Sequence, residues 1–120
     1  MEKNSFSNKY MSISLELAKE AADKGDIPVG AVIVDPSTDT IITKSHNRAN
    51  IDRDPTLHAE IICIKEACEI KGSKLLQGYD IYITLEPCAM CAAAISYARL
   101  SRIYFGAFDS KFGAIENGVR

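Results

Sequence analysis

The pattern of apolar positions in the first third of the chain predicts a helix followed by a β-hairpin. Apolar residues recur three and four positions apart from about Ser7 to Lys24, which is typical of an amphipathic helix. Gly25 follows where a C-terminal cap would stand. The β-branched run at 29–34 and the apolar run at 40–43 are separated by turn-forming residues, so they predict two antiparallel strands.

A second helix is expected in the middle of the chain. Asp54 can cap a helix and Pro55 suits a helix's first turn, so the helix is expected to start there and to continue to Lys71. On this pattern His58 and Glu60 fall in its first turns.

The last part of the chain predicts strand, helix and strand. Residues 79–84 alternate as a strand, a helix begins near Cys88, and residues 102–106 read as a further strand. Residues 89–98 are apolar on nearly every side, so this third helix is expected to be buried between the sheet and another layer. The order predicts a three-layer α/β/α sandwich: a mixed sheet with an N-terminal hairpin and parallel helix-linked strands.

Length, composition and charge indicate one ordinary globular domain. The chain has 120 residues, 47% hydrophobic and 25% charged, which is enough for one core but short for a separate substrate-binding lobe. A net charge of −2 does not point to nucleic-acid binding, which usually needs a basic excess. Residues 96–113 hold Arg99, Arg102 and Lys111 against Asp109 alone, so a basic rim and a mixed-charge surface both stay open.

Nothing in the sequence indicates a membrane. The N-terminus has no hydrophobic signal region, and no apolar run approaches the roughly 18 residues that span a bilayer. A cytoplasmic location is expected. In that reducing compartment the four cysteines suggest metal ligands and buried thiols rather than disulfides.

Two short motifs supply the ligands of a catalytic zinc site. His58 precedes Glu60 by two positions, and Cys88 and Cys91 lie three apart after Pro87. One imidazole and two thiolates leave a fourth position of a tetrahedral zinc open to water, and a carboxylate that is not a ligand can handle the water's protons. Both motifs are expected at helix N-termini, where free N–H groups favour thiolates. In this order they match the zinc deaminase signature H-x-E…P-C-x-x-C.

Each motif also has a structural interpretation. Two cysteines at this spacing occur in redox proteins and in structural zinc sites, so a non-catalytic zinc module stays an alternative. Cys63 and Cys68 are expected to be small buried hydrophobic residues, and His46 a loop or strand-end residue rather than a ligand. Glu86 is expected to cap the third helix.

Several further blocks extend the pattern beyond the metal motifs, from about residue 10 to 115. They are 27–32, 47–48, 54–61, 84–91 and 105–114. With these blocks the chain resembles the cytidine deaminase superfamily and, within it, the bacterial tRNA-specific adenosine deaminases. The resemblance implies one Zn²⁺ per subunit, a homodimer, and hydrolysis of adenosine to inosine at the wobble position of a tRNA anticodon loop.

The resemblance also implies roles for single residues. Asn47 would hydrogen-bond the target nucleotide, the Ala59 backbone would read the base edge, and Val29 would pack against the ring. Asp109 and Lys111 would lie beside the RNA loop. An anticodon loop presents unpaired bases, so extruding one costs less than from a duplex.

The chain departs from the family pattern in two places. Residues 92–94 are alanines where the family usually has a glycine, and the chain ends at Arg120 where family members continue with a fifth strand and a C-terminal helix. Residues 1–120 are therefore expected to form a single zinc-dependent deaminase domain without those two elements. A deaminase of a free base or nucleoside, such as guanine or cytosine, is the nearest alternative, because zinc chemistry alone does not choose the ring.

Overall fold

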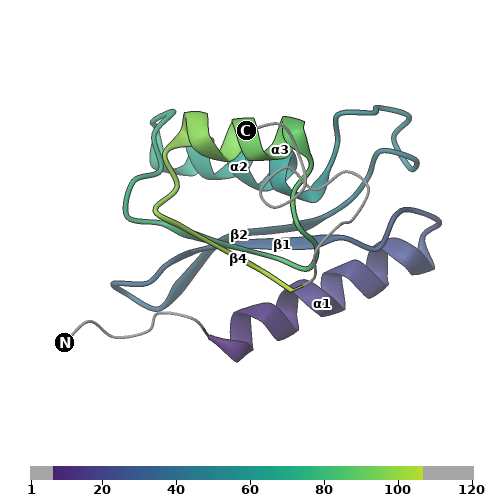
Figure 1. The fold of residues 1–120 in the computed structure, drawn as a ribbon, viewed down its shortest axis with the longest axis horizontal. Helices are drawn as coiled ribbons and strands as arrows, with labels where there is room; N and C mark the ends of the chain where they lie inside the picture. Colours follow the sequence, from purple (N-terminus) through teal and green to yellow (C-terminus); the bar gives the residue numbers. More distant parts are fainter. Residues whose placement is uncertain (1–6, 107–120) are drawn as a thin grey trace.

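A four-stranded sheet lies between one helix on one face and two helices on the other (Figure 1). The computed structural model describes residues 7–106. In chain order the elements are α1 (Asn8–Asp23), β1 (Gly30–Asp35), β2 (Thr40–His46), α2 (Ala59–Lys71), β3 (Asp80–Ile83), α3 (Ala89–Ala98) and β4 (Arg102–Phe105). No helix within the described residues is long and apolar enough to cross a membrane.

The sheet is mixed, as predicted. Its strand order is β2-β1-β3-β4, with β1 antiparallel to both neighbours and β4 parallel to β3. The helix-linked strands β2, β3 and β4 therefore run in one direction, which confirms the predicted sandwich. Because β1 runs the opposite way, it begins at the edge of the sheet where β2 and β3 end. The segments that flank these strand ends consequently meet at one edge.

α1 packs closely on the sheet through small residues and an aromatic cluster. Its buried residues are Tyr10, Ser14, Ala18 and Ala21. The ring of Tyr82 lies 5.4 Å from that of Tyr10 and stacks on Tyr104 at 4.8 Å. A Cβ added to Gly30 would lie 2.1 Å from the Ser14 carbonyl oxygen. The glycine that opens β1 is therefore required by the approach of α1.

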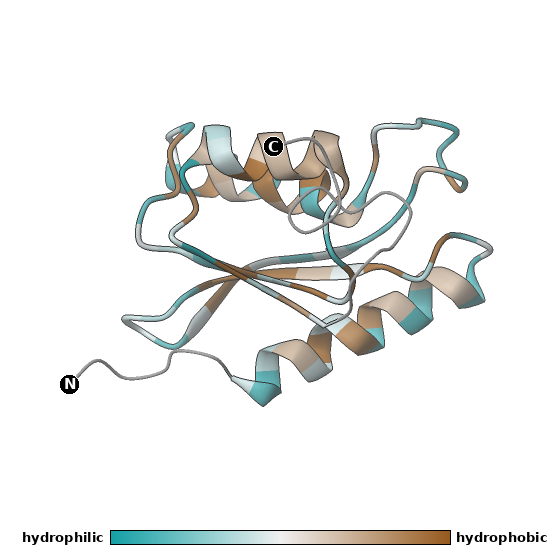
Figure 2. Cartoon of the chain, viewed as in Figure 1, coloured by the Kyte–Doolittle hydropathy of each residue, from teal (hydrophilic) through white to brown (hydrophobic). Residues whose placement is uncertain are grey.

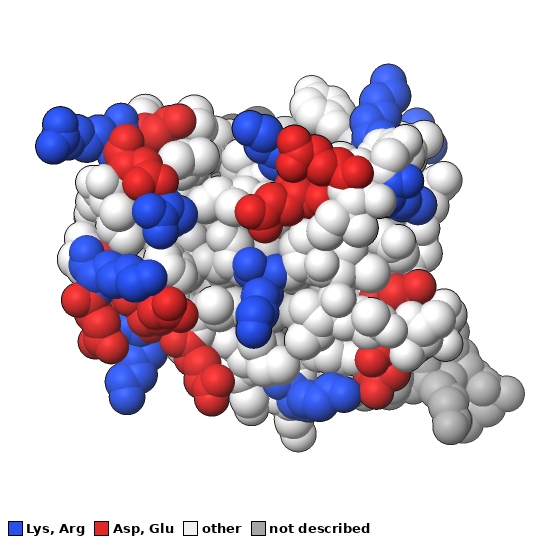
Figure 3. Space-filling view, turned by 180° about the vertical axis from the view of Figure 1, so that it is seen from behind, with Lys and Arg blue, Asp and Glu red and all other residues white. Residues whose placement is uncertain are grey.

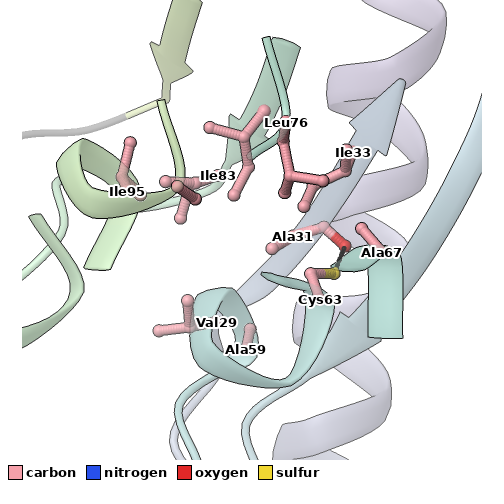
Figure 4. Packing of buried hydrophobic residues seen from close by; sticks show 11 residues of the cluster. Val29, Ala31, Ile33, Ala59, Cys63, Ala67, Leu76, Ile83 and Ile95 are labelled. Atoms are coloured by element: carbon pink, nitrogen blue, oxygen red, sulfur yellow. Dashed lines mark hydrogen bonds between the residues drawn. The ribbon is translucent and has the colours of Figure 1, made fainter. Parts of the chain in front are cut away.

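The larger core lies between the sheet and the α2–α3 layer (Figure 4). Its buried members are Val29, Ala31, Ile33, Ala59, Cys63, Ala67, Leu76, Ile81, Ile83, Ile95 and Ala98. The Cys63 thiol donates a hydrogen bond to the Ala31 carbonyl oxygen at 3.3 Å, and burial raises the pKa of that thiol. Cys63 is therefore the buried, unreactive residue that was predicted, whereas Cys68 is only partly buried.

α2 begins later than predicted. The Asp54 carboxylate accepts hydrogen bonds from the backbone N–H and the hydroxyl of Thr56, and residues 54–57 form a turn. The prediction that Asp54 caps the helix is wrong because this local turn already uses its carboxylate. The helix starts at Ala59, with His58 as its N-cap residue.

The expectation of an α3 buried between two layers is also wrong. Cys91, Ile95 and Ala98 face the core, but within the described structure the opposite side is open, with Met90 37% and Tyr97 81% exposed. Most of α3 falls in the hydrophobic half of the scale in Figure 2. The helix thus presents a largely apolar outer face. Its N-cap residue is Cys88 and not Glu86.

We expect Gly30→Ala to lower the free energy of unfolding by about 3 kcal/mol, because the added methyl group overlaps the α1 backbone. Gly72→Ala is the control. Its φ of 71° strains any residue with a Cβ, but nothing surrounds it, so we expect a loss of about 1 kcal/mol. Urea unfolding of the two variants measures the difference. Equal losses would contradict the close packing of α1 on β1.

Candidate metal centre and active site

The two predicted metal motifs stand at the first residues of α2 and α3. His58 is the N-cap residue of α2 and Cys88 that of α3, both with extended backbones, and Cys91 lies in the first turn of α3. Neither N-cap side chain bonds to its own helix, so both are available to a ligand. The unpaired N–H groups and positive dipole ends of the two helices favour bound thiolates.

The three side chains converge at distances that suit a zinc ion. The His58 Nδ1 atom lies 3.4 Å from the Cys91 sulfur and 3.6 Å from the Cys88 sulfur, and all three ligand atoms lie within 4.8 Å of one another. Tetrahedral zinc, with a Zn–S bond of about 2.3 Å and a Zn–N bond of about 2.0 Å, holds such N and S atoms about 3.5 Å apart. The donor set and its spacing therefore fit zinc.

The electrostatics of Cys91 also favour a cation. Burial raises the pKa of its thiol, and the nearby Glu60 carboxylate and Cys88 raise it further. A thiolate at this position is thus unfavourable unless a positive charge is next to it. A coordinated metal provides that charge and keeps the sulfur deprotonated.

Glu60 lies in the first turn of α2, close to this centre. It is only 3% exposed, and its Oε1 atom has no hydrogen-bond partner among the described residues. Burial raises the pKa of the Glu60 carboxyl, while donation to the carboxylate from its own backbone N–H and from the Cys91 thiol opposes that shift. An unpaired carboxylate oxygen that is buried in this way is costly, and such groups cluster at functional sites.

A cavity of about 350 Å³ opens beside the metal ligands. The residues that line it are Ile27, Val29, Asn47, His58, Glu60, Leu85, Glu86 and Cys88. They come from the segments before β1, after β2 and after β3, which meet at one edge of the sheet, and from the first turn of α2. The cavity therefore joins a mostly apolar wall to a small group of polar side chains, as in sites for small ligands and nucleobases.

Asn47 is held in a fixed orientation at the wall of the cavity. Its side-chain oxygen accepts a hydrogen bond from the Ala59 N–H at 2.8 Å, and its backbone N–H donates to the Val29 carbonyl at 3.0 Å. The Asn47 amide nitrogen makes no hydrogen bond within the described part of the chain. It can therefore donate to a ligand. The Ala59 N–H is already used by Asn47, which sequence reasoning did not anticipate.

All the predicted site residues that the structure describes come together: most line the cavity, Cys91 lies 3.4 Å from His58, and the Ala59 N–H bonds to Asn47. Asp109 and Lys111 lie outside the described residues, as does the expected C-terminal difference from the family. His46 is the last residue of β2, which confirms the predicted strand-end position, and its Nδ1 atom lies 2.8 Å from the Asn47 carbonyl oxygen.

Sequence reasoning missed three of the residues that line the cavity. Ile27 and Leu85 were seen only as neighbours within motifs, and Glu86 was predicted to be a cap. Their positions directly before β1 and after β3 are the signal that could have found them, because ligands bind at such strand ends.

The fold and the site define a class of protein before any comparison. A mixed sheet with helices on both faces holds an imidazole and two thiols at two helix starts, with a buried carboxylate beside them. This is the arrangement of a zinc-dependent hydrolase with an open coordination position.

The chain belongs to the family described as the cytidine and deoxycytidylate deaminase zinc-binding region, whose model matches residues 4–107. A tRNA-specific adenosine deaminase of Rickettsia felis is 54% identical over 110 residues, which cover 92% of this chain and 76% of that protein. The corresponding protein of Agrobacterium fabrum is 49% identical over 111 residues, or 92% of this chain and 72% of the relative.

Solved structures agree with this family. One from a study of A-to-I editing by tRNA:A34 deaminases at the wobble position of transfer RNA matches with a TM-score of 0.90 and 47% identity, covering 95% of this chain and 81% of the other. Guanine deaminase from Bacillus subtilis matches with a TM-score of 0.81 and 31% identity, covering 90% and 72%.

We expect Cys91→Ala to abolish zinc binding, since it removes one of three ligands, while the wild-type protein binds about one zinc ion per chain. Cys63→Ala is the matched control, because Cys63 is equally buried but lies in the core away from the ligands. The measurement is zinc content by atomic emission after gel filtration. Zinc retained by Cys91→Ala would contradict the ligand set.

Proposed function

We propose that this chain hydrolyses adenosine to inosine at the wobble position of a tRNA anticodon, and that residues 1–120 form one zinc-dependent deaminase domain acting in the cytoplasm. The observation that carries the reaction type is the His58–Cys88–Cys91 triangle with the buried, unpaired Glu60 oxygen beside it. Identity of up to 54% to tRNA-specific adenosine deaminases supports the choice of substrate.

In this proposal Glu60 moves the protons. Zinc held by the three ligands supplies a Lewis acid that makes a water molecule a stronger nucleophile. The Glu60 carboxylate accepts a proton from the water as the water oxygen bonds to C6, and it delivers that proton to the adjacent ring nitrogen. Glu60 then carries the proton of the new C6 hydroxyl to the amino group, so that the C6–N bond breaks, ammonia leaves and the C6 carbonyl of inosine remains. A carboxyl group whose pKa burial has raised is closer to the working pH, so it can serve as base and then as acid.

The other residues that line the cavity position the base. The Asn47 amide nitrogen, free within the described structure, would donate a hydrogen bond to the target nucleotide. Val29 would pack against the ring. The Ala59 backbone would read the base edge together with Asn47, because the Ala59 N–H is bonded to the Asn47 side-chain oxygen. Asp109 and Lys111 would contact the RNA loop.

A restricted RNA contact suits the charge distribution. The side of the molecule opposite to Figure 1 shows acidic and basic side chains intermixed with uncharged surface, without a continuous basic patch among the described residues drawn there (Figure 3). The net charge is −2. An unpaired anticodon loop needs only a small contact, because its target base is already accessible.

A second candidate is deamination of a free purine. The observation in its favour is the likeness to Bacillus subtilis guanine deaminase, at 31% identity and a TM-score of 0.81. The substrate in that protein's name is a free base. The cavity of about 350 Å³ would also hold one base.

We expect Glu60→Gln to retain zinc and to lose roughly 10²- to 10⁴-fold in kcat, since a neutral amide cannot take up the proton. The assay measures inosine and ammonia from an anticodon stem-loop carrying wobble adenosine. Glu66→Gln on the exposed side of α2 is the control and should match wild type. Unchanged activity of Glu60→Gln would remove its catalytic role, and loss of zinc would make it a ligand.

The same assay tests the substrate. Zinc-loaded wild-type protein is incubated in parallel with the stem-loop, guanine, cytosine and cytidine. Inosine from the stem-loop alone is the expected outcome. Ammonia from a free base alone would overturn the proposed function in favour of the second candidate.

We propose further that the chain forms a homodimer through the outer face of α3. Met90 and Tyr97 are exposed there on a largely apolar helix, and exposed apolar surface of this kind marks contact sites. α3 starts at the metal ligand Cys88. A second copy on this face would therefore lie close to the active site.

We expect Tyr97→Lys to raise the dimer dissociation constant at least about tenfold, because the interface would bury a charge without a partner. Leu15→Lys is the matched control: Leu15 is 55% exposed on α1, across the sheet from α3. Sedimentation equilibrium gives both constants. A monomeric wild type, or equal constants for the two variants, would rule out this interface.

A further inference from the structure

Asp26 joins two segments that are distant in sequence. It lies in the α1–β1 segment and is 7% exposed. Its carboxylate accepts three backbone hydrogen bonds: from Ile27 N–H at 2.8 Å, Asn50 N–H at 2.9 Å and Ile51 N–H at 3.0 Å. One side chain thus binds the segment before β1 to the loop between β2 and α2.

Both segments contribute to the cavity wall. The α1–β1 segment contributes Ile27 and Val29, and the β2–α2 loop begins with Asn47 and ends at His58. Among the described residues, two other hydrogen bonds join these segments: Asn47 N–H to the Val29 carbonyl at 3.0 Å, and a longer one of 3.4 Å from the Asn50 side chain to the Gly25 carbonyl. Asp26 therefore supplies two of the four hydrogen bonds that connect the two segments.

The connection depends on an ionised carboxylate. Burial by itself would raise the pKa of Asp26, but the three N–H groups, with a smaller contribution from His46, outweigh burial and lower it. The group therefore stays ionised at neutral pH. Two oxygens that only accept can satisfy three converging N–H donors, whereas an amide would turn an NH₂ group toward at least one of them.

We propose that Asp26 is a positioning residue for the target nucleotide. By holding Ile27 and the Asn50–Ile51 backbone, it sets the spacing between the apolar wall at Val29 and the amide of Asn47, which would together enclose the base. Asp26 touches neither the zinc ligands nor Glu60. Its effect is therefore on nucleotide binding more than on the chemical step, and this inference rests on the proposed function.

Asp26→Asn tests it, with Asp52→Asn as the matched control in the same loop. Asp52 is exposed, and within residues 7–106 its carboxylate pairs with Arg48 alone. We expect Asp26→Asn to keep zinc and to raise KM for the stem-loop about tenfold, with kcat reduced less than threefold. Asp52→Asn should match wild type in both constants.

Three further measurements separate positioning from a general loss of structure. Asp26→Glu keeps the charge but moves the acceptors by one methylene group, so its KM should fall between wild type and Asp26→Asn. Hydrogen exchange in Asp26→Asn should quicken at the amides of residues 27, 50 and 51 and stay unchanged in β1 and β3. The double variant Asp26→Asn, Asn47→Ala should raise KM by less than the product of the two single fold changes, because both substitutions disturb the same wall.

Each outcome decides the proposal. A KM for Asp26→Asn equal to that of wild type overturns it. Loss of zinc in both Asp26 variants, together with faster hydrogen exchange in β1 and β3, also overturns it, because Asp26 would then stabilise the fold as a whole. A wild type that does not deaminate the stem-loop rejects the proposed function instead. In that case binding of purine riboside, measured by titration calorimetry with the same variants, still tests the positioning role.

Discussion

The structure depends on bringing the starts of two helices within bonding distance of one metal ion. His58 and Cys88 are N-cap residues of α2 and α3, and the His58 nitrogen lies 3.6 Å and 3.4 Å from the Cys88 and Cys91 sulfurs. That spacing is possible because β2 and β3 run in the same direction, so the helices that follow both start at one edge of the sheet. The reversed strand β1 brings the segment at residues 27–29 to the same edge.

The site places polar groups where burial is unfavourable. Glu60 is 3% exposed with one oxygen unpaired, and the Cys91 thiol has its pKa raised by burial. Such groups lower stability unless a ligand satisfies them. The close packing of α1 at Gly30 and the continuous core beneath α2 and α3 supply the rigidity that keeps them in place. Asp26 differs from them, since all its bonds are made within the chain.

Periodicity in the sequence predicted the helices, the strands and the sandwich because each repeats one local pattern. It failed for the start of α2 and for the burial of α3, because tertiary contacts and local side-chain hydrogen bonds, not periodicity, decide these two features. Asp54 and Pro55 resemble a helix start, but the Asp54 carboxylate accepts hydrogen bonds from Thr56, and the helix begins only at Ala59. The largely apolar sequence of α3 suggested a helix buried on both sides. The structure leaves Tyr97 exposed, and an apolar outer face can equally be a contact surface for another chain. Hydrophobicity alone does not distinguish these two cases.

The sequence by itself determined the chemistry, because metal ligands and a proton-carrying carboxylate must be particular residue types: His58, Cys88, Cys91 and Glu60 could be chosen from their identity and spacing. Only the tertiary structure decided how the wall of the cavity is made. Asn47 is fixed by the Ala59 N–H, and Asp26 by backbone groups 24 and 25 residues away. Bonds from side chains to distant backbone N–H groups leave no residue pattern, since every residue except proline offers the same donor.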